Sequence, residues 1–468
     1  MKASGVPWLG DIPAGWEIRR NGRLFAQRNE TGFPELPILE VSLRTGVRVR
    51  DFDASSRKQV MADRDKYKRA VRGDIAYNMM RMWQGAVDVV PVDGLISPAY
   101  VVARPFAGTV SRYFAYLYRT DAYKGEVDNY SRGIVKDRNR LYWEAFKQIP
   151  TPYPPPDEQA AVVRFIDHAD RRIWRYIRAK QKLIKLLVEQ KRAIIHRAVT
   201  RGLDPNVRLK PSGVKWLGDV PEHWEIWQVG HFAAIGNGST PSRGNTAYWS
   251  GGTYPWLNSS SVNVGIITAS DQFVTEMALR ECHLPRVPKG SVLVAITGQG
   301  KTRGTAAVLM IEATINQHIA FITPRTREST ATAEFLRAVL VAAYSELRRI
   351  SDESGSTKGA LTCEDLRHFR VALPPVEEQQ EIVQWARDAT AEVEAMFRLT
   401  SSKISLLQEY RTRLIADVVT GKLDVRDAAA RLPDEVEEPE PFDEADALTD
   451  AEYDAAEDLD AALEEAEA

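Results

Sequence analysis

Residues 154–204 read PPPDEQAAVVRFIDHADRRIWRYIRAKQKLIKLLVEQKRAIIHRAVTRGLD, and this stretch decides the fold. It returns 220 positions later as residues 374–424, without a gap and with 16 of the 51 aligned residues identical. A long repeat at a fixed offset indicates that one architectural element is used twice in the chain.

Both copies are predicted to be long helices. Acidic pairs follow the opening prolines, and no Gly or Pro interrupts either copy before Gly202 and Gly421. Apolar residues recur in steps of three, four and seven, which is typical of a coiled coil. The predicted stripe consists of Ile166, Ile173, Ile177, Ile184, Leu187, Ile194, Val393, Phe397, Ile404, Leu407 and Leu414. The first copy is basic and the second acidic, which favours pairing with each other over packing of two unrelated helices on separate domains.

A second repeat flanks the first. The segment SGVPWLGDIPAGWEI at 4–18 returns as SGVKWLGDVPEHWEI at 212–226, matching at 11 of 15 positions. The chain therefore runs motif, variable insert, helix, and then the same order again. A pseudo-two-fold relation between the halves predicts that the N-terminal motif lies beside the end of the second helix. The tryptophans of both motifs are interpreted as packing anchors: Trp8, Trp16, Trp216 and Trp224.

The two inserts, at about 19–150 and 227–373, share the same order of predicted strands and turns but differ in their residues. GDIAYNMMRMWQGAVDVV (73–90) parallels GSVLVAITGQGKTRGTAAVLM (290–310), and both read as short strands broken by glycine-rich turns. The predicted fold class is α+β. It consists of two α/β domains with β-rich cores, joined by two long helices that form an antiparallel coiled coil with an internal pseudo-two-fold repeat.

The net charge of −2 hides an uneven distribution. Residues 434–468 hold 17 Asp and Glu and no Lys or Arg, so residues 1–433 carry 62 basic against 64 − 17 = 47 acidic residues, or +15. A basic body suits a polyanion, and the acidic composition predicts a disordered tail. The absence of a signal-peptide core, of an 18-residue apolar run and of metal spacing around the two cysteines predicts a soluble cytoplasmic protein without a membrane partner.

From residue 4 to about 425 the sequence resembles the specificity subunit of type I restriction-modification systems. The resemblance rests on the WLGDIPxxWE openings, the PPxxEQ helix starts, the TRGLD and TGKLD helix ends, and insert patterns such as GNGSTPSRGNTAYWSGGTYPWLNSSSV. The implied domains are a first target recognition domain (1–153), a spacer helix (154–204), a second recognition domain (205–373), a second helix (374–425), and a linker with the acidic tail (426–468). The tail departs from the family pattern.

The resemblance implies that each recognition domain reads half of a bipartite, asymmetric site in double-stranded DNA. The coiled coil then sets the spacing and docks two methyltransferase (modification) subunits, with restriction subunits carrying nuclease activity. The chain itself is expected to be non-catalytic and without a cofactor, while S-adenosylmethionine, ATP and Mg²⁺ are expected in the partner subunits. The recognised sequence, the spacer length and the presence of a restriction subunit stay open.

The residues favour a DNA reader over a catalyst. The sequence has no [DNS]PP[YF] motif of amino-methyltransferases, and the seven histidines lack metal-ligand spacing. AITGQGKT at 295–302 resembles a phosphate loop, but RGTAAVLMI follows it and reads as turn and strand instead of the helix that such a loop requires. Two alternatives are an enzyme that modifies DNA alone and a freestanding DNA-binding regulator or coiled-coil scaffold.

Polar and basic residues in the insert turns are the candidates for DNA contact. Arg can hold a guanine and Asn or Gln an adenine, whereas Lys, Ser and Thr more often bind phosphate. In insert one the candidates are Arg44, Arg48, Arg50, Asn78, Arg81, Trp83, Gln84, Arg132, Lys136, Arg138 and Arg140. In insert two they are Ser239, Thr240, Ser242, Arg243, Asn258, Ser259, Gln299, Lys301, Thr302, Arg303, Asn316, Gln317 and Lys358. For any one of them, a solvated or turn-forming role is an equal alternative.

Overall fold

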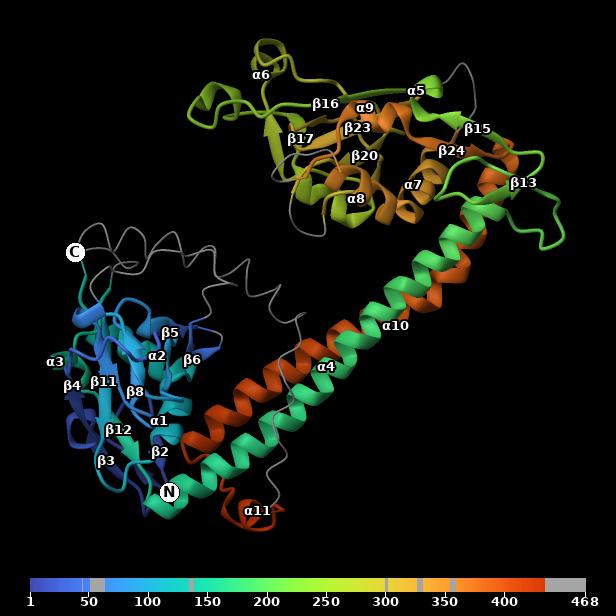
Figure 1. Cartoon of the computed structure of the whole chain (residues 1–468). Helices are drawn as coiled ribbons and strands as arrows, with labels where there is room; N and C mark the ends of the chain where they lie inside the picture. Colours follow the sequence, from blue (N-terminus) through green and yellow to red (C-terminus); the bar gives the residue numbers. More distant parts are fainter. Residues whose placement is uncertain are drawn as a thin grey trace. The chain divides into compact units, whose positions relative to one another are not determined.

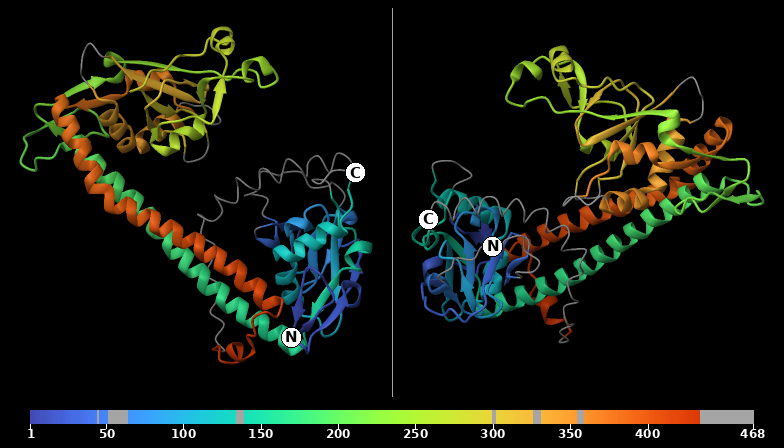
Figure 2. Two further views of the ribbon diagram at one scale, coloured as in Figure 1. Left: turned by 180° about the vertical axis from the view of Figure 1, so that it is seen from behind. Right: turned by 45° about the horizontal axis from the view of Figure 1, so that its top comes forward.

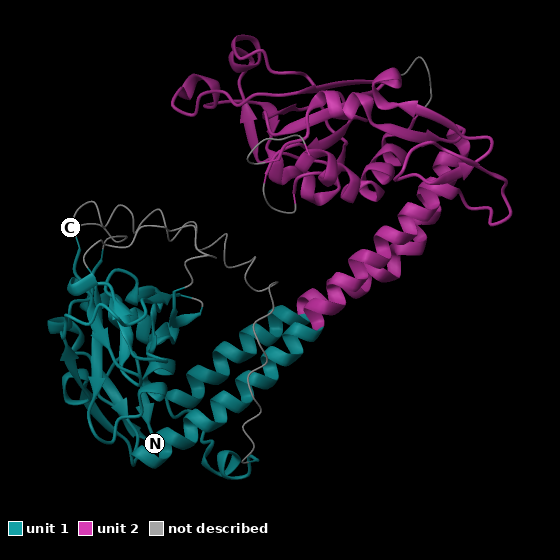
Figure 3. Cartoon of the chain, viewed as in Figure 1, with its two compact units in different colours: residues 1–179, 403–468 teal, residues 180–402 magenta. Residues whose placement is uncertain are grey.

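The computed structural model describes residues 1–43, 45–50, 64–133, 139–298, 302–325, 331–353 and 359–433. The chain forms two compact units, of which unit 1 comprises residues 1–179 with those from 403 onward, and unit 2 comprises residues 180–402 (Figures 1 and 3). Each half of the long repeat therefore contributes to both units. The acidic segment 434–468 lies outside the described residues.

The two repeat copies form the long helices α4 (Pro156–Arg201) and α10 (Val376–Val419). Acidic residues occupy the first turn of each, where they complement the positive end of the helix dipole. Both helices are followed closely by a glycine in the left-handed region, Gly202 (φ +72°) and Gly421 (φ +74°), a conformation that suits glycine because it lacks a Cβ. The helix ends were thus predictable from residue type.

Interhelical ion pairs show that α4 and α10 run antiparallel. In unit 1 Arg411 pairs with Asp170, and in unit 2 the Nζ of Lys191 lies 2.6 Å from the Oε1 of Glu394. Paired residues whose numbers rise on one helix and fall on the other require opposite chain directions. Figures 1 and 2 show the two ribbons side by side, and the predicted antiparallel pair is confirmed.

The apolar stripe is buried unevenly. Ile166, Ile173, Ile177, Leu187 and Val393 are buried. Ile184, Ile194, Ile404, Leu407 and Leu414 are half-buried. Phe397 is 38 % exposed, so this predicted stripe position faces solvent in the structure. A two-helix contact covers only a narrow seam, which explains why its edge positions stay partly open.

Each insert is held at its two ends by a two-stranded ribbon. In unit 1, β3 (Glu17–Arg20) pairs antiparallel with β12 (Pro150–Tyr153), and in unit 2, β15 (Glu225–Gln228) pairs with β24 (Arg370–Leu373). In both cases the end of the WLGD motif pairs with the residues directly before a long helix. The insert can therefore vary without changing how it leaves the scaffold.

The two insert sheets have the same strand order. Unit 1 has the order β4-β11-β8-β9, and unit 2 has β16-β23-β20-β21 with β18 added at the edge. The unit 1 strands are β4 (Phe25–Arg28), β8 (Ile75–Asn78), β9 (Val87–Val89) and β11 (Tyr100–Pro105). The unit 2 strands are β16 (Ala233–Asn237), β18 (Ile266–Ile267), β20 (Val292–Ala295), β21 (Ala306–Leu309) and β23 (Ile319–Pro324). The segments that were paired in the sequence, 73–90 and 290–310, hold equivalent strands, so the predicted α+β fold with an internal repeat is confirmed.

Short elements complete the units. In unit 1 these are β1 (Lys2–Ala3), β2 (Asp11–Ile12), β5 (Leu39–Ser42), β6 (Gly46–Val49), β7 (Lys68–Ala70), β10 (Gly94–Ile96), α1 (Ser111–Tyr118), α2 (Asp121–Tyr130), α3 (Trp143–Phe146) and α11 (Arg426–Ala430). In unit 2 they are β13 (Leu209–Pro211), β14 (Asp219–Pro221), α5 (Val229–Phe232), β17 (Tyr254–Leu257), β19 (Gln272–Val274), α6 (Glu276–Glu281), β22 (Thr314–Ile315), α7 (Ala333–Ala342), α8 (Tyr344–Glu353) and α9 (Cys363–His368).

The C-terminal end of each long helix is buried in the core that the insert of the other half of the sequence builds. In unit 1, Val418 and Val419 of α10 are fully buried in the core that the first insert builds. A Cβ on Gly421 would lie 2.9 Å from the ring of Trp16, so the N-terminal motif sits against the end of the second helix as predicted. In unit 2, Val199 of α4 shares a core with Trp224.

The motif tryptophans pack as anchors, as predicted. Trp16 and Trp224 are 1 % and 0 % exposed. Trp8 meets the ring of Tyr123 edge-on at 5.4 Å between centroids, and Trp216 stacks on Phe369 at the same distance. Aromatic side chains of this size bury a large area, so they fix the motifs firmly in each unit.

The repeated glutamine at each helix start binds the insert to the helix. Gln159 Oε1 accepts from the backbone N–H of Val110 (2.9 Å), just before α1. Gln379 Oε1 accepts from the N–H of Thr332 (2.8 Å), which caps α7. Each amide nitrogen also donates to the carbonyl of the proline five positions earlier, Pro154 for Gln159 and Pro374 for Gln379 (2.8 and 2.9 Å). Both side chains are 0 % exposed, so no water can replace these bonds without rearrangement.

We predict that Gln379→Leu destabilises unit 2 by about 2–6 kcal/mol, because two backbone groups lose their partner at about 1–3 kcal/mol each. The melting transition of unit 2 should fall by several degrees in differential scanning calorimetry. The control is Gln380→Leu, the same substitution at the exposed neighbouring position. Equal melting temperatures for the two variants would contradict a role for Gln379 in holding the insert.

Candidate nucleic-acid interface

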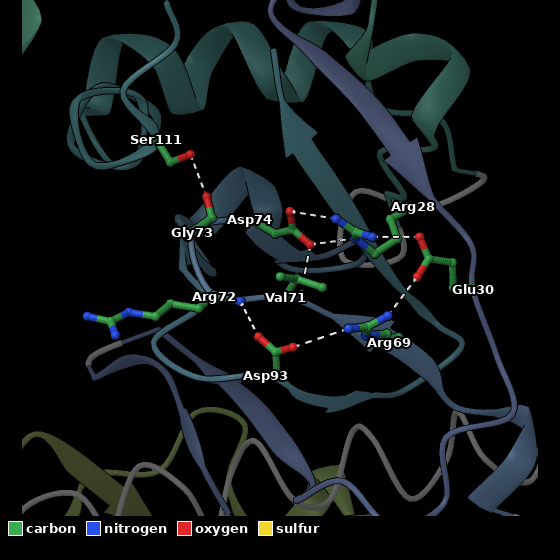
Figure 4. A network of polar contacts seen from close by, with 9 residues as sticks. All are labelled: Arg28, Glu30, Arg69, Val71, Arg72, Gly73, Asp74, Asp93 and Ser111. Carbon is green, nitrogen blue, oxygen red and sulfur yellow. Dashed lines mark hydrogen bonds and ion pairs between the residues drawn. The ribbon is translucent and has the colours of Figure 1, made fainter. Parts of the chain in front are cut away.

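In insert one, a polar network fixes the start of β8, the strand that leads to the candidate turn 78–84 (Figure 4). Arg28 Nε donates to Asp74 (2.7 Å), and Asp74 accepts from the N–H of Val71 (2.9 Å). Burial opposes the charge of Arg28, but hydrogen bonding to Asp74 and the nearby carboxylates outweigh it, so the pKa of Arg28 is raised. Nearby, the backbone N–H of Arg72 lowers the pKa of Asp93. The turn at the other end of β8 thus projects from a rigid base.

The candidate turn itself is partly structural. Asn78 is 6 % exposed, and its Oδ1 accepts from the N–H of Met80 (2.9 Å). Trp83 is half-buried, and its Nε1 donates to the carbonyl of Met80 (2.9 Å). Gln84 is exposed and Arg81 half-buried. DNA contact by Arg81 and Gln84 therefore stays a prediction, while Asn78 shapes the turn.

The other insert-one candidates lie on two separate segments. Arg48 is exposed on β6 and pairs with Glu40, and Arg50 is half-buried just after that strand. Arg132 and Arg140 form an isolated antiparallel bridge, with Arg132 exposed. Arg44, Lys136 and Arg138 lie outside the described residues.

In insert two, the structure brings three candidate segments together. The N–H of Ser239 donates to the carbonyl of Ile315 (3.1 Å), and the N–H of Asn316 donates to Leu257 (3.0 Å). Thr240 Oγ1 donates to Gln317 Oε1 (2.6 Å). The turns after β16, β17 and β22 therefore form one polar surface, which we call the three-turn cluster: Ser239, Thr240, Ser242, Arg243, Asn258, Ser259 and Gln317.

Close backbone approach holds this cluster together. A Cβ on Gly238 would lie 1.8 Å from the carbonyl oxygen of Ile315, so only glycine fits between the turns. Asn258 Oδ1 accepts from the N–H of Ser260 (3.0 Å), which caps the short helix that follows β17. These contacts fix the backbone while Thr240 and Gln317 remain exposed.

Arg243 is held on an aromatic platform. Its guanidinium lies 3.9 Å from the ring centroid of Trp249 and 5.0 Å from that of Trp256, and Nη2 donates to Gln272 Oε1 (2.7 Å). Stacking holds an exposed guanidinium in place, which reduces the entropy lost when it binds. The sequence reasoning missed Trp249, Trp256 and Gln272, although both tryptophans stand in the quoted segment TAYWSGGTYPWLN.

Arg303 and Asn316 do not lie at the surface. Arg303 is 4 % exposed and pairs with Asp352, and a Cβ on Gly359 would lie 2.1 Å from its Nη1. Asn316 is 5 % exposed, and its Oδ1 accepts from the N–H of His318 (3.0 Å). We correct the expectation that they contact DNA, because burial gives both a structural role. Thr302 is half-buried, with its carbonyl accepting from Thr305 Oγ1 (2.6 Å). Gln299, Lys301 and Lys358 lie outside the described residues.

The segment after the phosphate-loop look-alike is strand β21, as predicted, and not a helix. Within the residues that the structure describes, no group of three His, Cys, Asp or Glu could hold a metal ion. Among the same residues, no helix is both long and apolar enough to cross a bilayer.

Residues 221–394 match the family model of the type I restriction modification DNA specificity domain. The matched range contains the three-turn cluster. The resemblance to type I specificity subunits is confirmed. Unit 2 thus carries a type I DNA specificity domain.

Known relatives agree with the family model. The chain is 20 % identical over 184 residues to the type I restriction enzyme EcoR124I/EcoR124II specificity subunit of Escherichia coli, covering 39 % of this chain and 42 % of that protein. It is 21 % identical over 449 residues to a putative MjaX specificity subunit of Methanocaldococcus jannaschii, covering 89 % and 96 %. The first match thus spans about two fifths of the relative's length.

A solved structure shares the fold. A chain described under "complex assembly and conformational transition of the type I R-M system" superposes with a TM-score of 0.62 at 18 % identity, covering 88 % of this chain and all of the other. At this identity the likeness supports the fold alone.

We predict different losses for two arginines of insert two. Arg243→Ala should weaken binding to double-stranded DNA by about 1–3 kcal/mol, because it removes a held guanidinium from an exposed surface. Arg303→Ala should instead lower the melting temperature of unit 2, because it empties a buried site and leaves Asp352 without this partner. Fluorescence anisotropy with labelled DNA and calorimetry on both variants provide the measurements. Equal DNA affinities for Arg243→Ala and the native chain would contradict the assignment.

Proposed function

We propose that this chain is a non-catalytic subunit that reads a bipartite, asymmetric DNA site, one half through each insert. The observation that carries the proposal is that the two units share one backbone arrangement but differ in the polar residues of their turns. Both units have the same sheet order and the same ribbon at the insert ends, yet their exposed polar residues differ. Two related frames with different surfaces suit two different half-sites.

The turns offer the chemistry that reading of DNA requires. Insert one presents Arg81 and Gln84 after β8, and insert two presents Arg243 and Gln317 in the three-turn cluster. Guanidinium and amide groups can bond two atoms of a guanine or adenine edge at once, whereas the serine hydroxyls of the cluster suit phosphate. The body charge of +15 over residues 1–433 favours binding to a polyanion in addition.

We further propose that the long helices dock two modification subunits, one on each unit. Unit 1 exposes Tyr176 (55 %) and Leu406 (63 %), and unit 2 exposes Met396 (46 %) and Leu186 (55 %). These pairs are equivalent under the 220-residue repeat, since Leu186 corresponds to Leu406 and Tyr176 to Met396. Exposed apolar side chains at equivalent positions suit two copies of one partner.

In this proposal the chemistry belongs to the partners. The modification subunits supply adenine methylation with S-adenosylmethionine, and restriction subunits supply nuclease activity with ATP and Mg²⁺. The residues of this chain bind and position DNA. Their role is to select where the partners act.

The proposal is tested by exchanging one insert. We expect that replacing residues 229–369 with the matching segment of a relative changes one half of the methylated site and leaves the other half unchanged. These limits keep β15 and β24, whose pairing holds the insert to the scaffold. Methylome sequencing of a host that expresses the whole system gives the recognised site, and the reciprocal exchange of insert one is the matched control. A change in both halves would contradict independent reading.

The docking proposal predicts a complex of one chain with two modification subunits. Leu186→Glu and Leu406→Glu should each reduce this to a one-to-one complex, because a charge opposes burial of an apolar contact. Native mass spectrometry of the purified complexes measures the stoichiometry. Gln190→Glu and Gln408→Glu, at exposed positions on the same helices, are the controls. A complex with two partners in both leucine variants would contradict the docking sites.

A further inference from the structure

Two arginines of insert two stack on aromatic side chains of the same strand, β17. Tyr254 and Trp256 stand two positions apart, so both side chains lie on one face of this strand. The guanidinium of Arg286 lies 4.9 Å from the ring centroid of Tyr254, and that of Arg243 lies 5.0 Å from the ring centroid of Trp256. Both arginines are exposed. The strand thus holds two guanidinium groups in similar positions.

The two guanidinium groups differ in how their charge is met. Nη2 of Arg286 lies 2.7 Å from Oε2 of Glu276, and Nη1 lies 4.0 Å from Oε1 of Glu312. Within the part of the chain that the structure describes, Arg243 has no carboxylate partner, and its Nη2 instead donates to the neutral Oε1 of Gln272 (2.7 Å). The charge of Arg286 is therefore met by two carboxylates, whereas Arg243 is held by a neutral group.

The plane of the Arg243 guanidinium is restrained by an indole of its own turn. The group lies over the ring of Trp249, 3.9 Å from the centroid. Trp249 Nε1 donates to the carbonyl of Ser242, the residue before Arg243 (3.1 Å), and the ring meets that of Trp256 edge-on at 5.2 Å between centroids. The indole covers one face of the guanidinium and Gln272 bonds its edge, so both its position and its plane are fixed.

Gln272 is itself held by the small sheet that contains β17. It lies on β19, in register with Trp256. Ser270 Oγ lies 2.8 Å from the carbonyl oxygens of both Trp256 and Gln272, within hydrogen-bond distance of each. Gln272 is half-buried. The amide oxygen that accepts from Arg243 is therefore presented from a fixed point of the backbone.

We propose that Arg243 reads a guanine in the half-site of insert two, and that Gln272 is the positioning residue that aims it. Guanine presents two acceptors, O6 and N7, in the major groove, and no other base presents two acceptors there. A guanidinium with a fixed plane can donate two parallel hydrogen bonds to this edge. One of its five N–H donors bonds Gln272, and the other four are enough for such a pair.

A phosphate oxygen accepts from many directions, so phosphate binding would gain little from a guanidinium that is held in one plane. The fixed plane therefore favours a base edge over the DNA backbone. This inference rests on the proposed function, because it names the base that one side chain of the reader selects.

Selection of duplexes from a random library by the full chain tests the base assignment. Arg243→Lys keeps the charge but loses the fork of donors. The preference for a G·C pair at one position should therefore fall about 5- to 150-fold, with the other positions unchanged. Arg286→Lys is the matched control, because it makes the same change at a stacked guanidinium that two carboxylates already meet. It should leave the preference at every position unchanged.

The possible failures of this selection differ from one another. If Arg243→Lys weakened binding equally for all sequences, or changed nothing, Arg243 would bind phosphate or no DNA at all. Either result would overturn the inference and leave sequence reading intact. If the native chain preferred no base at any position, the inference and the proposed function would both be overturned.

Two variants of Gln272 separate aiming from a purely structural role. Gln272→Met keeps the side-chain length but removes the acceptor, so the same G·C preference should fall about three- to tenfold. Gln272→Glu supplies an acceptor at the same place and should preserve the preference, while its negative charge weakens binding to all sequences. Melting temperatures show whether both variants are folded. A full preference in Gln272→Met, or an equal loss of preference in both variants, would overturn the role of Gln272.

Discussion

The antiparallel pairing of α4 and α10 is the constraint on which the rest of the structure depends. Because the helices run in opposite directions, the end of each lies at the start of the other. Val418 and Val419 of α10 can then fill the core of unit 1, and Ala198 and Val199 of α4 can fill that of unit 2. Parallel helices would bring both ends to one unit and leave the other core incomplete.

The same groups anchor both units to this helix pair. A glutamine at each helix start is bonded to the insert, and a buried tryptophan packs at each helix end, Trp16 in unit 1 and Trp224 in unit 2. Burying an indole contributes roughly 4 kcal/mol from its area alone. The residues that the two halves share therefore lie where the scaffold meets the insert, and the residues that differ lie in the turns. This distribution supports a common frame with two separate readers.

The sequence predicted the scaffold well because periodicity, helix-ending glycines and repeated motifs are local signals. It predicted side-chain roles in the turns less well. Arg303 stands in a glycine-rich turn that suggests exposure, yet it pairs with Asp352, 49 positions later, and is buried. Arg243 gains its position from Trp249, Trp256 and Gln272, which the chain brings together only on folding. Burial and stacking are tertiary properties, and residue type in a turn does not reveal them. The residues of the three-turn cluster were predicted as candidates, but the sequence did not predict that they form one surface.

The resemblance to type I specificity subunits implies that the paired helices set the distance between the two readers, and lengthening both helices tests this central expectation most directly. Seven residues inserted after Ala179 in α4 and seven after Ser402 in α10 fall where the two units divide, and a heptad preserves the apolar register. The helices gain about 10.5 Å. At about 3.4 Å per base pair, methylation mapping should show a non-specific gap longer by about three base pairs with both half-sites unchanged. Methylation at the original spacing by the lengthened protein would contradict the account.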